Sequence, residues 1–265
     1  MRTELISEAA DPGRPNEDFA ALAVPASGQG GALVVLDGVT PPPGNGNCLH
    51  SVHWFCARLG GALTELSVSR RDLTLREVLS AAIARTAEAH AGTCELSHPR
   101  TPQTTVVVAR WSEATVEYLV LSDSVLLAEG PDGTVTALLD DRLARLPRAS
   151  LATDAIVDAT VRNKEGGFFT AAADPSVAAR AVAGELPRTA VRALAALTDG
   201  ATRWTETFHQ GDWTQLFTYV REEGAAALVE RVRVLEAADR ADRAERGRPG
   251  RGKTHDDATV VFVRL

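Results

Sequence analysis

The sequence predicts an α+β fold in which helices cover antiparallel sheets. Strand-like apolar runs occur in groups, and the groups are separated by consecutive helical patterns rather than by single helices. A doubly wound parallel sheet would require strands and helices to alternate regularly, and this chain does not alternate them. Neighbouring strands separated by short turns are instead typical of antiparallel sheets.

Composition favours a globular protein with one domain. The chain has 265 residues, of which 45% are hydrophobic and 24% charged, and it shows neither a repeat nor a linker. We therefore expect a single domain over residues 1–265. The formal net charge of −7 argues against nucleic acid and membrane as partners, and we expect a monomer.

The N-terminus carries acidic residues and has no apolar core, so we expect no signal peptide, and no apolar run reaches the length of a membrane helix. The expected location is cytoplasmic. The three cysteines are an odd number without a metal-type pairing, which predicts reduced thiols.

The N-terminal third predicts two strands and then two helices. Asp18–Val24 and Ala32–Leu36 flank a glycine-rich turn, and the Pro/Gly-rich residues 41–46 form a loop that cannot continue a strand. Helices are predicted over Leu49–Leu63 and Leu75–His90, since their apolar residues recur at helical spacing.

The middle of the chain predicts further strands at Thr104–Trp111, Val116–Leu121, Val125–Ala128, Thr134–Leu138 and Phe168–Ala172. Residues 140–163 are polar and in part helical. Asp174 and Pro175 suit the cap and first position of a short helix. The run Val191–Leu197 is either a buried strand or a short helix, because its periodicity fits both.

The C-terminal part predicts helices over Trp213–Arg221 and Ala225–Ala238 and a closing strand over Thr259–Val263. Between them, residues 237–254 are rich in Arg, Asp and Gly, which predicts a mobile loop.

Acidic residues stand beside these apolar runs at five places. They are Asn16-Glu17-Asp18, Asp37-Gly38, Asp123, Asp199-Gly200 and Asp256-Asp257. Carboxylates that converge at strand ends repel one another unless a cation lies between them. Carboxylate and carbonyl ligands without nearby Cys/His pairs suit Mg²⁺ or Mn²⁺. The sequence therefore predicts a metal-dependent hydrolytic site.

These motifs, together with Thr104-Thr105 and the turn Ser122-Asp123-Ser124, occur in the order found in type 2C metal-dependent protein phosphatases, and the chain resembles that family over residues 14–262. The resemblance implies two antiparallel β-sheets sandwiched between pairs of α-helices, with two metals at one end of the sandwich.

The resemblance also implies the site residues. Asp37 would bridge two Mn²⁺ or Mg²⁺ ions, the Gly38 carbonyl would ligate one of them, and Asp199 and Asp256 would be terminal ligands. Asp123 either helps to hold a third ion or only stabilises its turn.

Glu17 and Asp18 resemble the pair that holds metal-bound water, and Arg14 is the candidate that binds the substrate phosphate. The family arginine usually precedes the glutamate by four positions, whereas Arg14 precedes Glu17 by three. The chain also lacks the family's glycines after Asp37-Gly38.

The His50-x-x-His53 spacing leaves two alternatives. The two histidines bind a metal together, or one of them faces the site as a proton donor while the other is structural. We take His50 as the candidate proton donor.

The function implied is hydrolysis of phosphoserine and phosphothreonine in proteins by a hydroxide that bridges two divalent metals. Two alternatives remain open. One is a phosphatase of a small phosphorylated metabolite, and the other is a non-catalytic relative that binds metal or a partner protein.

Overall fold

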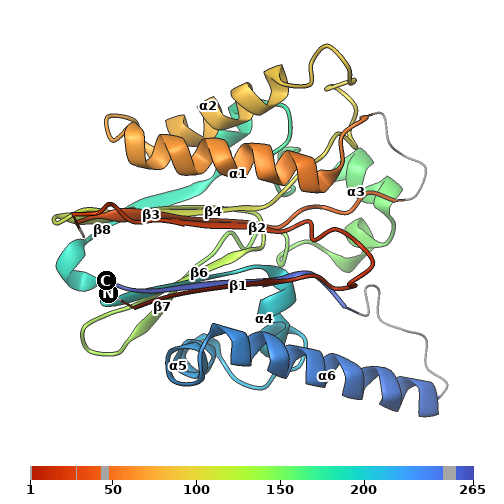
Figure 1. The fold of residues 1–265 in the computed structure, drawn as a ribbon. Coiled ribbons are helices and arrows are strands. Elements are labelled where there is room, and N and C mark those ends of the chain that lie inside the picture. Colours follow the sequence, from red (N-terminus) through yellow and green to blue (C-terminus); the bar gives the residue numbers. More distant parts are fainter. Residues whose placement is uncertain (1, 28, 43–47, 247–254) are drawn as a thin grey trace.

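The computed structural model describes residues 2–27, 29–42, 48–246 and 255–265. Two five-stranded antiparallel sheets lie face to face, and helices cover both outer faces, which gives four layers (Figure 1). The predicted α+β class and the sheet sandwich implied by the resemblance are both confirmed.

The first sheet contains both ends of the described chain. Its strands are, in spatial order, β1 (Arg2–Glu8), β10 (Ala258–Arg264), β9 (Ala193–Leu197), β6 (Val125–Glu129) and β7 (Val135–Leu138). Helices α4 (Asp199–Glu206), α5 (Trp213–Glu223) and α6 (Ala225–Glu245) cover its outer face (Figure 1). Because β1 pairs with β10, the first and last strands of the chain lie side by side.

The second sheet is covered by a pair of helices. Its strands are β2 (Phe19–Ala23), β3 (Gly31–Leu36), β4 (Val106–Trp111), β5 (Thr115–Leu121) and β8 (Val182–Pro187). Helices α1 (Val52–Ser69) and α2 (Leu75–Glu88) pack on its outer face, and the short helix α3 (Asp154–Thr160) lies at one end of the sandwich (Figure 1). Thr74 forms a capping box with Glu77, and α2 begins at Leu75 as predicted. Ser51 caps α1, which therefore begins at Val52 rather than at the predicted Leu49 and continues past Leu63 to Ser69.

The core explains why the central strands are continuous apolar runs. In β3, Val34 and Leu36 pack against the helix layer, whereas Leu33 and Val35 pack against the other sheet. Full burial of such a side chain contributes about 1.5–3 kcal/mol. Central strands that are buried on both faces provide rigid positions for the residues at their ends.

Several elements differ from the sequence prediction. Strands β1 and β8 were missed, since both are edge strands with mostly exposed or half-buried residues and lack an apolar run. The ambiguous run at 191–197 is strand β9. Residues 168–172 form no strand and make only isolated bridges, from Phe168 to Arg162 and from Ala171 to Thr104.

The predicted mobile loop over residues 237–254 is wrong in its first half. Helix α6 continues to Glu245, supported by ion pairs one helical turn apart between Asp239 and Arg243 and between Asp242 and Arg246. Residues 247–254 lie outside the described residues. Among the described helices, none combines the length and apolar character needed to cross a bilayer.

Candidate metal centre

Asp37 and Gly38 are fixed at the end of β3. The Asp37 carbonyl accepts hydrogen bonds from the Thr105 N–H (2.9 Å) and the Thr104 hydroxyl (2.8 Å). A Cβ on Gly38 would lie 2.4 Å from a methyl carbon of Val52 and 2.6 Å from the Glu17 carbonyl oxygen, so no larger residue fits without rearrangement. The backbone after β3 is therefore held from both sides, and the Asp37 carboxylate has a defined position.

Asp199 connects the first sheet to Asp37 of the second sheet. It is the first residue of α4, separated from β9 only by Thr198, and its N–H donates to Asp37 Oδ2 at 3.4 Å. The following Gly200 packs against the Asp257 backbone, where a Cβ would lie 2.0 Å from the carbonyl oxygen. The two Asp-Gly elements, distant in sequence, therefore meet where the two sheets end.

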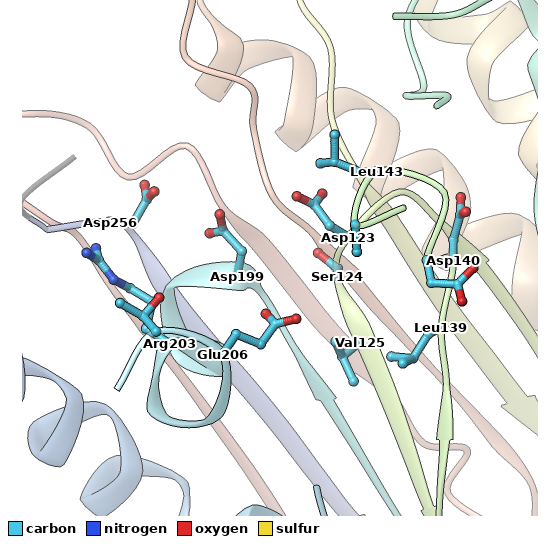
Figure 2. A pocket seen from close by; sticks show the side chains of 13 residues that line it. Asp123, Ser124, Val125, Leu139, Asp140, Leu143, Asp199, Arg203, Glu206 and Asp256 are labelled. Atoms are coloured by element: carbon cyan, nitrogen blue, oxygen red, sulfur yellow. The ribbon is translucent and has the colours of Figure 1, made fainter. Parts of the chain in front are cut away.

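Asp256 and Asp257, which precede β10, have different surroundings. The Asp257 carboxylate accepts from the Ala10 N–H at 2.8 Å and from the Glu17 N–H at 2.6 Å, so it anchors the N-terminal segment. Asp256 lines a cavity of about 600 Å³ together with Asp123 and Asp199. Figure 2 shows the carboxylates of these three residues in a row, directed toward the same space.

The Asp123 turn is held from both sheets. Ser122 has a φ of 69° and donates its N–H to Asp140, while its hydroxyl donates to the Asp123 carboxylate at 3.0 Å. Ser124 shares a hydrogen bond of 2.6 Å with Thr105. Asp123 therefore faces the cavity from the connection between β5 and β6.

Glu17 and Asp18 approach the site from the chain before β2. Glu17 accepts from the Thr40 hydroxyl. One carboxylate oxygen of Asp18 accepts from the hydroxyls of Thr198 (3.0 Å) and Thr259 (2.7 Å). Its other oxygen, Oδ1, is buried and has no hydrogen-bond partner among the described residues.

The carboxylates of this cluster are buried close together, and a bound cation would neutralise their charge. Burial, followed by the neighbouring carboxylates of Asp199, Asp18, Asp256 and Asp123, raises the pKa of Asp37 well above its usual range. Burial also raises the pKa of Asp18 to about 8 and, with the nearby Asp140, the pKa of Asp123. The exclusively oxygen donors and the buried, unpartnered oxygen of Asp18 fit a hard divalent cation such as Mg²⁺ or Mn²⁺.

Arg14 lies at the rim of the site. It is exposed and lines one cavity with Glu17, Asp256 and Asp257, and another with Glu17 and His50. This placement is compatible with contact to a bound anion.

Sequence reasoning missed a second arginine. Arg162 lines a cavity of about 330 Å³ with Asp37, Asp123 and Asp199, and its Nε lies 3.2 Å from Asp158. Arg162 follows α3 in the irregular stretch before Phe168, and only its charge, in a polar region without a motif, could have pointed to it. Glu206 of α4, which lines the larger cavity, was missed for the same reason.

The structure does not bring His50 into the carboxylate cluster. Its Nδ1 lies 3.4 Å from Cys94 Sγ and 3.7 Å from Cys48 Sγ. His53 is turned elsewhere and its Nδ1 lies 2.8 Å from the Asn16 carbonyl oxygen. The alternative that His50 and His53 bind a metal together is therefore wrong, since helix α1 begins between them and directs the two rings apart.

Comparisons with known proteins agree with this geometry. A family model described as "Protein phosphatase 2C" matches residues 7–233. The chain belongs to the protein phosphatase 2C family. No match is found among curated protein sequences.

Solved structures of this family share the fold. The serine/threonine phosphatase Stp1 from Staphylococcus aureus is 13% identical, with a TM-score of 0.61 over 99% of this chain and 94% of that one. The serine/threonine phosphatase PstP/Ppp from Mycobacterium tuberculosis is 17% identical (TM-score 0.58, 100% and 98% covered).

A third similar structure, serine-threonine phosphatase 2C from Toxoplasma gondii, is 15% identical (TM-score 0.60, 99% and 94% covered). At these identities the structures establish the fold, and the family match establishes membership in a family of phosphatase enzymes. The predicted family and enzyme class are thus confirmed.

Proposed function

We propose that this chain is a metal-dependent phosphatase that hydrolyses phosphoserine and phosphothreonine in proteins. The observation that carries the proposal is the convergence of four aspartates from both sheets, with the buried Asp37 at their centre. A cluster of buried carboxylates destabilises a protein unless it binds cations, and family membership supplies the phosphatase chemistry.

The metal ligands in this proposal are Asp37, the Gly38 carbonyl, Asp199 and Asp256, with Asp123 toward a third ion. Two Mn²⁺ or Mg²⁺ ions bound there would activate a water molecule between them and neutralise phosphoryl oxygens. The rigid attachment of these residues to β3, β9 and β10 keeps their oxygens aligned before substrate arrives.

The remaining residues have supporting roles. Glu17 and Asp18 accept hydrogen bonds from water at the cluster, and the buried Oδ1 of Asp18 is available for this. Arg14 binds substrate phosphate at the rim, and Arg162 offers a second guanidinium on the cavity wall beside Asp123. The exposed rim around Arg14 favours a phosphorylated side chain on a protein surface over a small metabolite, which would require an enclosed pocket.

The proposal is tested by phosphate release from phosphoserine and phosphothreonine peptides and from a sugar phosphate, with Mn²⁺ or Mg²⁺ and with chelator. We expect release from the peptides only when metal is present. Release from the sugar phosphate alone would favour a metabolite phosphatase. No release from any substrate, while Mn²⁺ still raises the melting temperature, would favour a non-catalytic metal-binding relative.

A further inference from the structure

Two cysteines and two histidines converge beside the helix pair, next to the cavity that Arg14 and Glu17 line. They are Cys48, His50, His90 and Cys94, and their nearest ligand atoms all lie within 4.8 Å of one another. From this geometry we propose a structural Zn²⁺ site with Cys₂His₂ ligation, which ties the segment before α1 to the turn after α2. This inference is independent of the proposed phosphatase activity.

The distances between the four side chains suit a tetrahedral ion. Zn–S bonds of about 2.3 Å and Zn–N bonds of about 2.1 Å imply sulfur–nitrogen edges of about 3.6 Å. Cys48 Sγ lies 3.5 Å from His90 Nδ1 and 3.7 Å from His50 Nδ1, and Cys94 Sγ lies 3.4 Å from His50 Nδ1. The two sulfurs are 3.1 Å apart, which is longer than the S–S bond of about 2.05 Å in a disulfide. A small outward movement of one sulfur completes the tetrahedron.

Backbone N–H groups are directed at both sulfurs, although burial still raises the pKa of Cys48 to about 11. The Leu49 N–H donates to Cys94 Sγ, and the His50 N–H donates to Cys48 Sγ, each at 3.4 Å. Donors directed at sulfur stabilise its charged form. Each sulfur therefore has an N–H donor from the segment 48–50, which places this segment around the proposed ion.

His90 is poorly satisfied without a metal. It is 1% exposed, and its Nδ1, the ring nitrogen that faces the site, is directed only at sulfur. The Trp54 ring packs 4.0 Å from the His50 ring and 5.4 Å from the His90 ring, between centroids, and covers one side of the cluster. Thiols are weak hydrogen-bond partners, whereas a neutral imidazole in such surroundings is a good zinc ligand.

The four side chains come from two separate segments of the chain, so an ion bound by them would hold these segments together. The Cys94 N–H donates to the His90 carbonyl, so these two side chains project from one helical turn after α2. Cys48 and His50 immediately precede α1, whose first turn lies at the same end of the antiparallel pair (Figure 1). Four protein ligands leave no open coordination position, which is typical of a structural rather than a catalytic zinc site.

This site and the carboxylate cluster also differ in their metal-binding atoms. Thiolate and imidazole ligands select Zn²⁺, whereas the all-oxygen cluster around Asp37 selects Mg²⁺ or Mn²⁺. All three cysteines are free, as the sequence predicts, but Cys48 and Cys94 lie together in this cluster, whereas Cys56 is buried in α1.

The test is the metal content of the untagged full chain after dialysis against Mg²⁺-containing buffer. We expect about one tightly bound zinc per chain, lost in the double variant Cys48→Ser/Cys94→Ser and kept in the matched thiol control Cys56→Ala. Cobalt replacement of the zinc should give the thiolate charge-transfer and d–d bands of a tetrahedral site, a readout that needs no variant to fold.

Three outcomes would overturn the proposal. Thiols are counted after denaturation, because Cys56 is buried in the folded protein. The first outcome is no zinc with three reactive thiols. The second is no zinc with one reactive thiol, because Cys48 and Cys94 form a disulfide, and the third is zinc that remains bound in the double variant.

Discussion

Replacement of Asp18 by asparagine should stabilise the metal-free protein, increasingly so as the pH rises. Burial is the main cause that raises the pKa of Asp18 from 3.8 to about 8 in the folded state. Below pH 3.8 the carboxyl is protonated in both folded and unfolded chains, so the raised pKa does not lower the free energy of unfolding. Between pH 3.8 and about 8 the unfolded chain ionises and the folded chain does not, so stability falls with rising pH.

The magnitude follows from one pKa unit being worth about 1.4 kcal/mol. The loss of unfolding free energy due to Asp18 is about 2 kcal/mol at pH 5 and about 4 kcal/mol at pH 7. Asparagine has the same shape, does not ionise, and keeps an oxygen to accept from Thr198 and Thr259. The stability difference between Asp18→Asn and the parent should therefore grow by about 3 kcal/mol from pH 5 to pH 7.

Urea unfolding at several pH values, with chelator and followed by tryptophan fluorescence, measures this difference. Asp72→Asn is the control that should change stability in the opposite direction. The nearby Arg70 lowers the pKa of the exposed Asp72 to about 2, so loss of this carboxylate should slightly destabilise the protein above pH 4. A difference for Asp18→Asn that stays constant or shrinks from pH 5 to pH 7 would refute a buried, protonated Asp18. With Mn²⁺ present the advantage of asparagine should diminish, since the cation stabilises the carboxylate form.

Three further predictions concern the carboxylate cluster and its rim. Asp37→Asn should abolish phosphate release and the Mn²⁺-induced rise in melting temperature while the circular dichroism spectrum is kept; near-normal turnover would contradict its role. Gly38→Ala should lower the free energy of unfolding by about 1–3 kcal/mol, because the added Cβ has no space. Gly61→Ala is the control: a Cβ there meets open space on α1, so the same thermal melts should show no change or a gain of up to about 1 kcal/mol. Arg14→Ala should raise KM for a phosphopeptide more than it lowers kcat and should weaken inhibition by free phosphate; unchanged KM and inhibition would remove Arg14 from the site.

The proposed ligands could be selected from the sequence because they stand in local patterns. Asp37 and Asp199 each stand at the end of an apolar run and are followed by glycine. This pattern can be recognised without knowledge of the packing. Arg162 has no such pattern, and only the path of the chain after α3 places it beside Asp37.

The misassignment of His50 has a similar cause. Its partners His90 and Cys94 lie beyond α2, so the cluster exists only once the two helices have packed. Strand β1 shows where prediction of the fold from sequence fails. It has no apolar run, and it pairs with β10 at the opposite end of the chain. Sequence patterns thus indicated what local periodicity encodes, and missed what long-range packing decides.

The position of the carboxylates at the boundary of the two sheets makes the site sensitive to the thickness of the core between them. Asp37 follows a strand of one sheet, Asp199 follows a strand of the other, and an N–H to carboxylate contact joins them. Side chains such as Val35 and Val261, buried between the sheets, set how far apart these ligands stand. A change in the volume of these interior side chains would therefore move one proposed ligand relative to the other. The gap between two carboxylate oxygens thus depends on the volume of an apolar interior that no substrate touches.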